Sequence, residues 1–255
     1  MGQKYFAWSF DDGLEQDERI IEVLRKYGMG ATFHLNSGMM GERTQILRVS
    51  TLGFLNVPEE KFNAQKRHFF PHVNANRLPV EKVRNLYMDF EVASHTAKHP
   101  PLPLLPPWKQ KDEIVGDIQA LSELFNREIK TFAYPFGLNN KATRKQLAKA
   151  GIQYARTVSA RDTFDYPEDT LDIGMNGWQV QKDVFEKLDR FYEADSSKDQ
   201  FFLMFTHGYE LDFGVKESNW DKFEKICKEV SSHKDIICCS IGDALDAMNH
   251  SKKGG

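Results

Sequence analysis

The sequence has few cysteines and no excess of charge of either sign. Only three of its 255 residues are cysteines, namely Cys227, Cys238 and Cys239, and no Cys-x-x-Cys pair occurs. An odd number of cysteines, two of them adjacent, is neither a disulfide framework nor a cysteine metal pattern. Lys and Arg number 34 against 37 Asp and Glu, a net charge of −3. We therefore expect no broad attraction for nucleic acid or anionic lipid.

Long apolar runs are also absent. None approaches the roughly 20 residues that a membrane-spanning helix needs, so no membrane span is expected. Residues 1–6 do not resemble a secretory leader, because a strand-like segment begins almost at once. We expect the protein either in the cytoplasm or exported after loss of a leader, and the sequence leaves this choice open.

Short apolar runs alternate with helical patterns along the whole chain. Hydrophobic residues make up 40% and charged residues 28%, which are ordinary globular values and exclude global disorder. The runs predicted to be strands are 5–10, 31–35, 90–94, 131–134, 154–159, 201–206 and 236–241. This alternation indicates a parallel sheet, either open or closed into a barrel. Residues 36–76 fit no repeating unit and are interpreted as an insertion with a short helix around 59–65.

Polar side chains follow several predicted strands at the point where each strand ends. These residues are Asp11, Asp12, His95, His99 and His207. Because the carboxyl ends of parallel strands converge on one face, two carboxylates and three imidazoles are expected on one rim. Taken singly, Asp-Asp-Gly is typical of a turn and His-x-x-x-His of a surface pair, so it is their conjunction that indicates a site. Nothing in the sequence pairs with His34, which is not expected to take part.

These residue types are suited to metal-assisted hydrolysis. Adjacent aspartates beside a buried strand are costly unless one of them takes up a proton or a cation neutralises them. Two histidines and one carboxylate suit Zn²⁺, and also non-haem iron. A metal lowers the pKa of bound water to about 7, and a second carboxylate that does not bind the metal could then take the proton. His207 could protonate a leaving group.

Four motifs resemble those of polysaccharide deacetylases with the NodB homology domain, carbohydrate esterase family 4. Residues 9–13 (Ser-Phe-Asp-Asp-Gly) resemble the first motif, and residues 94–100 (Ser-His-Thr-Ala-Lys-His-Pro) the second. Residues 132–137 (Phe-Ala-Tyr-Pro-Phe-Gly) resemble the third and 205–208 (Phe-Thr-His-Gly) the last. Their order and spacing match over nearly the whole chain.

The resemblance implies an α/β fold, a deformed (β/α) barrel of about seven parallel strands. Residues 1–255 would form a single domain with the insertion at about 36–76. The implied metal ligands are Asp12, His95 and His99, with Zn²⁺ the usual ion and Co²⁺, Ni²⁺ or Mn²⁺ as further candidates. Asp11 would be the general base that activates metal-bound water for attack on an acetyl carbonyl, and His207 would be the general acid.

The resemblance also implies residues that contact the substrate, an acetylated carbohydrate. The implied substrate or oxyanion residues are Tyr134, Phe136, Arg156, Trp178 and Phe205. The backbone N–H of Phe136 would stabilise the oxyanion. Phe205 and Trp178 would wall the pocket for the acetyl methyl group.

The chain departs from the family pattern in two places. Ala133 stands where many members have an arginine that pairs with the catalytic aspartate, and we expect Arg156, on the next strand, to reach Asp11 instead. The fourth motif, whose carboxylate orients the catalytic histidine, is not recognisable. The candidates for that role are Asp162, Asp165, Asp172 and Glu210.

The predicted function is hydrolytic removal of N- or O-linked acetyl groups from a carbohydrate. One alternative is a related hydrolase acting on small amides or cyclic imides that are not sugars. Another is a carbohydrate-binding relative without activity, and a remote one is an iron oxygenase. The presence of all five rim residues argues against a decayed site.

Overall fold

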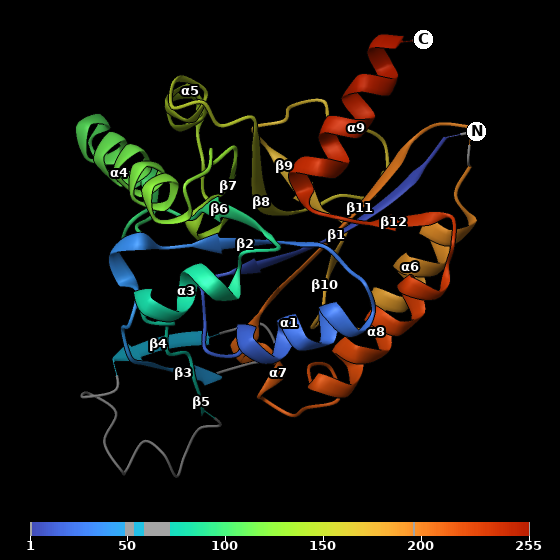
Figure 1. Cartoon of the computed structure of the whole chain (residues 1–255), viewed down its shortest axis with the longest axis horizontal. Helices are drawn as coiled ribbons and strands as arrows, with labels where there is room; N and C mark the ends of the chain where they lie inside the picture. The colour runs from blue at the N-terminus through green and yellow to red at the C-terminus, as the bar shows by residue number, and fades with distance from the viewer. Residues whose placement is uncertain (1, 49–53, 59–71, 196, 255) are drawn as a thin grey trace.

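The computed structural model describes residues 2–48, 54–58, 72–195 and 197–254 (Figure 1). The helix predicted around residues 59–65 lies outside these ranges. Among the described residues, no helix combines the length and apolar character that crossing a bilayer requires.

In the described part of the chain, eight strands form one continuous path in which every neighbouring pair is parallel, in the order β10-β11-β1-β2-β6-β7-β8-β9. They are β1 (Lys4–Asp11), β2 (Ala31–Leu35), β6 (Glu91–Ser94), β7 (Thr131–Ala133), β8 (Tyr154–Ala160), β9 (Ile173–Met175), β10 (Gly177–Trp178) and β11 (Gln200–His207). A ninth strand, β12 (Ile236–Cys238), pairs with the first half of β1, where β2 does not reach. The predicted parallel (β/α) barrel is confirmed, with β9 and β10 as short strands that the sequence did not indicate.

The two ends of this path are consecutive in the chain and are separated by Asn176. The backbone N–H of Asn176 donates to the Leu203 carbonyl on β11 at 2.9 Å, and its Oδ1 accepts from Leu203 N–H at 3.0 Å. Its Nδ2 donates to the carbonyls of Arg161 and Thr163. One buried asparagine therefore brings the two edges together, and the sheet curls into a nearly closed barrel.

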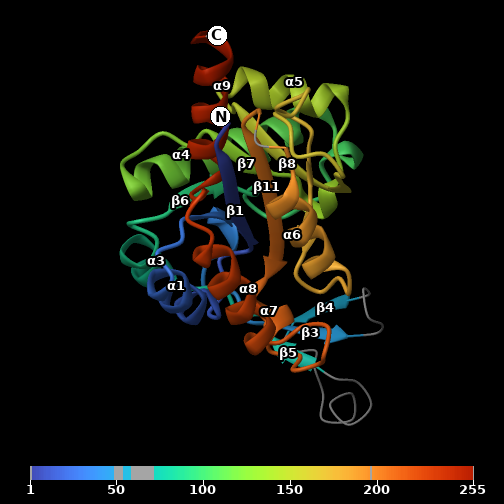
Figure 2. The same ribbon diagram turned by 90° about the vertical axis from the view of Figure 1, so that its right-hand side faces the viewer.

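Helices surround the barrel (Figures 1 and 2). They are α1 (Asp17–Lys26), α3 (Val80–Leu86), α4 (Pro107–Phe125), α5 (Lys141–Lys149), α6 (Val184–Glu193), α7 (Gly208–Leu211), α8 (Trp220–Ser232) and α9 (Ile241–Gly254). Successive side chains of a strand alternate between faces. Trp8 therefore points outward, where its ring lies 5.1 Å from that of Phe223 on α8, while Tyr5 and Ala7 join the core inside the barrel.

Helix α9 closes the barrel at the amino ends of the strands. Its residues Ile241 and Leu245 belong to the interior core. The carboxylate of Glu91 accepts hydrogen bonds from Thr32 and Thr131, both at 2.6 Å, and from the N–H of Gly242 in the first turn of α9. The prediction that the last strand extends to Ile241 was wrong, because β12 ends at Cys238 and the helix begins at Ile241.

Residues 36–76 contain a second, antiparallel sheet in the order β4-β3-β5. Its strands are β3 (Thr44–Arg48), β4 (Phe54–Pro58) and β5 (His72–Asn74), and the short helix η1 (Ser37–Met39) precedes them. Ile46 of this sheet packs with Leu14 and with Tyr209 of α7, at the carboxyl ends of the barrel strands (Figure 2). The interpretation of this stretch as an insertion in a single domain stays a prediction.

Candidate active site

Strand register brings three ionisable side chains together at the carboxyl end of β1. Asp11, the last residue of β1, lies opposite His207 on β11 and opposite His34 on β2. Directly paired residues of neighbouring strands point to the same face. The three side chains therefore meet at the rim of the barrel, beside a cavity of about 460 Å³. The cavity is lined by Asp11, Asp12, Ile46, Arg77, His95, His99, Tyr134, Phe136, Val158, Trp178, Phe205, His207 and Tyr209.

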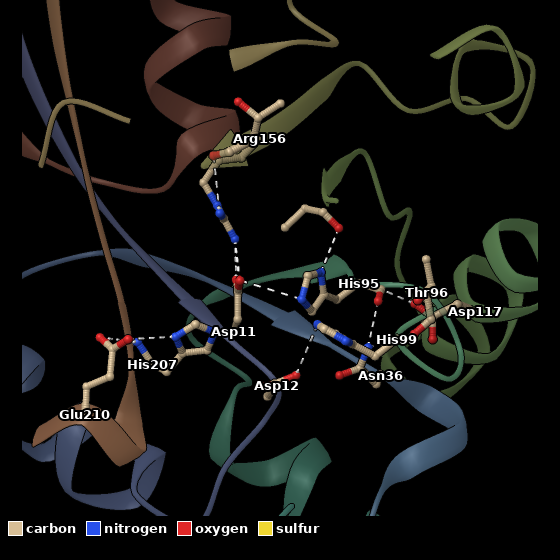
Figure 3. Close-up of polar contacts among 12 residues, drawn as sticks. Asp11, Asp12, Asn36, His95, Thr96, His99, Asp117, Arg156, His207 and Glu210 are labelled. Carbon is tan, nitrogen blue, oxygen red and sulfur yellow. Dashed lines mark hydrogen bonds and ion pairs between the residues drawn. The ribbon is translucent and has the colours of Figure 1, made fainter. Parts of the chain in front are cut away.

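Arg156 pairs with Asp11 inside the barrel. Its Nη2 donates to both carboxylate oxygens, at 2.5 and 2.6 Å, and both side chains are buried (Figure 3). Burial alone would raise the pKa of Asp11, but Arg156 and the neighbouring histidines hold it well below its usual value. The predicted contact is present. Arg156 lies opposite Ala133 in the β7–β8 register, so the arginine is supplied from one strand further along the sheet.

Asp12, His95 and His99 place one possible ligand atom each within 4.8 Å of one another. His99 Nε2 lies 4.0 Å from Asp12 Oδ1. Asp12 and His99 both have positive φ, of 81° and 54°, so the loops after β1 and β6 turn tightly at these positions. Figure 3 shows the three side chains, from two separate loops, directed toward a common space.

The protonation states of this group suit a metal ion. Burial lowers the pKa of His95, and lowers that of His99 to about 4, so both rings are neutral at neutral pH. Burial opposes ionisation of Asp12, but Arg77 and the histidines lower its pKa, so it is an anion. His95 Nδ1 donates to the carbonyl of Ala133 at 2.7 Å, which fixes the tautomer that leaves Nε2 available. Two neutral imidazoles and one carboxylate are a donor set that fits Zn²⁺ or a related divalent ion.

Two buried residues hold the His95–His99 loop from behind. Asp117 on α4 accepts hydrogen bonds from Ser94 Oγ at 2.6 Å and from the N–H groups of His95 and Ser37. Asn36 Nδ2 donates to the carbonyl of His95 at 2.6 Å. Neither was predicted, although an aspartate three residues after Ile114, on the apolar face of α4, was a visible signal.

His207 is oriented by Glu210, one turn along in α7. The His207 Nδ1 atom lies 3.0 Å from Glu210 Oε1 (Figure 3). The other carboxylate oxygen accepts from Trp178 Nε1 at 2.8 Å and from Thr206 Oγ1 at 2.7 Å. Burial would lower the pKa of His207, but the hydrogen bond and the charge of Glu210 raise it. Of the four carboxylates considered, Glu210 is thus the one in contact, whereas Asp172 pairs with Arg144.

Aromatic side chains form much of the cavity wall. The rings of Trp178 and Phe205 lie 5.8 Å apart. Phe136 is 59% exposed, packs its ring 4.7 Å from that of His99, and has a positive φ of 59° in the short helix η4 (Pro135–Gly137). Tyr134 is buried and donates its hydroxyl to the carbonyl of Leu171 at 2.8 Å, so it supports the loop.

Two residues near the rim were not among the predicted site residues. Arg77, just after β5, donates from Nη2 to Asp12 Oδ1 at 3.0 Å and is buried. His34, which was not expected to take part, is buried beside Asp11 with its ring centroid 6.4 Å from that of His95. Both contacts join segments that are distant in the sequence, so no local pattern indicated them.

Comparison with known proteins gives one family and one fold. The family model described as Polysaccharide deacetylase matches residues 1–155. A putative polysaccharide deacetylase from Mycobacterium smegmatis is 14% identical, over 99% of this chain and 92% of that one, with a TM-score of 0.64. The family 4 carbohydrate esterase from Streptomyces lividans in complex with acetate is 17% identical, over 92% and 91%, with a TM-score of 0.52.

The deacetylase PplD from Streptococcus pyogenes is a longer chain. The match is 18% identical with a TM-score of 0.49 and covers 65% of this chain, but only 61% of the length of PplD. A comparison with curated protein sequences found no match.

Proposed function

Because this chain belongs to the polysaccharide deacetylase family, we propose that it is a metal-dependent hydrolase that removes an N- or O-linked acetyl group from a carbohydrate. The observation that carries the proposal is the convergence of a metal-suited triad, a separate buried aspartate and a carboxylate-oriented histidine on one cavity.

Asp12, His95 and His99 would hold the metal. When bound there, a divalent ion would polarise the acetyl carbonyl and lower the pKa of water. The protonation and orientation of these side chains suit this role. The two rings are neutral, and the hydrogen bond from His95 to Ala133 sets its orientation.

Asp11 would be the general base. Arg156 keeps its carboxylate ionised in a buried position, so it is ready to take a proton from the attacking water. The oxygen of that water forms the new bond to the acetyl carbon. The backbone N–H of Phe136 would donate to the carbonyl oxygen as negative charge develops on it.

His207 would be the general acid. Its Nδ1 is engaged by Glu210, which leaves Nε2 as the ring nitrogen that can reach the substrate. As the bond between the carbonyl carbon and the sugar nitrogen or oxygen breaks, Nε2 would donate its proton to the departing atom. The products are acetate and the free amine or hydroxyl group. Phe205 and Trp178 would enclose the acetyl methyl group and exclude water from it.

Acetate release from a panel of acetylated glycans tests the proposal. Zinc-loaded protein is compared with Asp11→Asn and Asp12→Asn, and an exposed-site variant, Asp112→Asn, serves as the matched control. We expect zinc-dependent release that Asp11→Asn abolishes with its metal content intact, and that Asp12→Asn abolishes together with metal binding. Stoichiometric metal without release from any glycan would overturn the proposal. Turnover of small amides or cyclic imides would then identify a related hydrolase, and glycan binding alone a protein without activity.

A further inference from the structure

Arg77 is a buried cation in the cavity that the proposed reaction does not use. Backbone hydrogen bonds fix its position: Leu78 N–H donates to the carbonyl of Gly13, in the first motif, and Arg77 N–H donates to the carbonyl of Glu42, both at 2.9 Å. Its side chain is 4% exposed and lines the cavity beside Asp12. The guanidinium is therefore fixed within contact of a proposed metal ligand.

The hydrogen-bonding capacity of Arg77 is mostly unused. A guanidinium has five N–H donors. Among the described residues, its hydrogen-bond partner is Asp12 Oδ1, at 3.0 Å from Nη2, and its buried Nε has none. Unpaired buried donors of a charged group are costly, so a ligand with acceptor oxygens would be favoured here.

The charges of the site point to the same kind of ligand. Asp11 is matched by Arg156, and Asp12 by Arg77. Within the described part of the chain, the cavity lining contains no further carboxylate. A divalent metal on Asp12 would use the charge that now balances Arg77 and leave a net positive cavity.

We propose that Arg77 determines specificity by binding an acidic group, a carboxylate or a phosphate, on the acetylated carbohydrate. This inference rests on the proposed deacetylase function. The planar guanidinium presents paired donors that match such a group. Because Arg77 contacts the proposed metal ligand Asp12, the acidic group lies on the sugar unit that loses its acetyl group or on the unit next to it.

Binding and turnover are measured with three acetylated disaccharides that are matched except for one group. One is neutral, one carries a carboxylate and one carries a phosphate, so the two acidic compounds distinguish the two sources of negative charge. Affinities are measured calorimetrically with zinc-loaded Asp11→Asn protein, and KM and kcat with the active enzyme. Arg77→Gln and Arg77→Lys are compared with Arg84→Gln, an exposed arginine on α3 that gives the same change of charge.

We expect one acidic disaccharide to bind roughly 10–100-fold more tightly than the neutral one, the range of a charged hydrogen bond. Arg77→Gln should abolish this preference, mainly through KM, Arg77→Lys should retain part of it, and Arg84→Gln should retain all of it. The preference should be weaker in metal-free protein, because there the Asp12 carboxylate remains paired with Arg77. Zinc content, measured directly, should be equal in all variants.

Equal affinity for acidic and neutral sugars in the zinc-loaded protein would overturn the inference. An equal loss of affinity for all three disaccharides in Arg77→Gln would also overturn it. Acetate release without charge preference would leave the deacetylase function intact and refute the role of Arg77. Arg77-dependent binding of acidic sugars without acetate release from any glycan would refute the function and not the binding role.

Discussion

Glu210 Oε1 lies 3.0 Å from His207 Nδ1, and the two residues are only three apart in the chain. The contact forms because α7 begins directly after β11, so the first turn of the helix brings the Glu210 carboxylate next to the His207 ring. Glu210 is itself fully buried and held by Trp178 and Thr206. A local glutamate therefore occupies the orienting position for which three distant aspartates were also candidates.

Replacing Glu210 with Gln should move the alkaline limb of the pH–rate profile to lower pH. Glu210 raises the pKa of His207, so the variant loses its protonated acid at a lower pH than the wild type. At neutral pH we expect kcat to fall roughly 10–100-fold, part of the usual contribution of a general acid. The profile of acetate release between pH 5 and 9 measures this, with exposed Glu186→Gln as control. An unmoved alkaline limb would contradict the role of Glu210.

Replacing Arg156 with Met should destabilise the protein and shift the acidic limb of the profile upward. The buried Asp11 carboxylate would lose its partner, which typically costs about 3–5 kcal/mol in the free energy of unfolding. In the wild type, the lowered pKa of Asp11 stabilises the fold above the ordinary value of 3.8, and this contribution is lost as the pH falls. In the variant the pKa rises, and stability should instead decrease as the pH increases.

Denaturant unfolding and pH–rate measurements test this prediction. The double variant Asp11→Asn with Arg156→Met should recover part of the lost stability, because no unpaired charge is buried. Arg144→Met, which breaks a more exposed pair with Asp172, should cost about 1 kcal/mol or less. Unchanged rate, profile and stability in the Arg156 variant would refute the proposed pairing.

Zinc affinity should depend little on histidine protonation between pH 6 and 8. Because the pKa of His99 is lowered to about 4 and that of His95 is also lowered, protons do not compete for these nitrogens in that range. Competition with a chromophoric chelator should give about one equivalent of bound metal and a steep loss of affinity only in acid. His99→Gln should weaken binding at every pH, whereas exposed His250→Gln should not. A loss of affinity centred near pH 6.5 would contradict this prediction.

Replacing Glu91 with Ala should reduce stability and leave the chemistry unchanged. The variant would lose three hydrogen bonds that join β2, β7 and the first turn of α9. We expect a loss of about 2–4 kcal/mol, since several buried donors are left unpaired. Thermal unfolding and kcat at low temperature measure the two effects. The control Asp89→Ala, which breaks a surface pair with Arg25, should lower the free energy of unfolding by less than about 1 kcal/mol. Equal losses of stability in the two variants would contradict the structural role of Glu91.

The sequence alone was sufficient for the parallel sheet and for the residues that converge on its rim, and the resemblance of its motifs to a known family indicated that the sheet closes into a barrel. Both predictions depend on local patterns, because the end of each apolar run marks the carboxyl end of a parallel strand and these ends lie on one face. A buried run that ends at Asp11, or at His207, places that side chain at the carboxyl end of a strand. The parallel register of β1 and β11 then sets the two residues opposite each other. The absence of an arginine at Ala133 was informative as well, because a buried carboxylate needs a cation, and Arg156 was the candidate on the next strand.

Only the tertiary structure decided what surrounds these residues. Arg77 meets Asp12 from 65 positions away, Asp117 supports His95 from another layer, and Glu91 meets α9 across 151 positions. Such contacts depend on how helices and the second sheet pack against the barrel, and no periodicity along the chain encodes their distances. The sequence by itself therefore determined which side chains could carry the chemistry and indicated Arg156 as the partner of Asp11. Packing determined the other contacts, such as Arg77 with Asp12, and hence the protonation states.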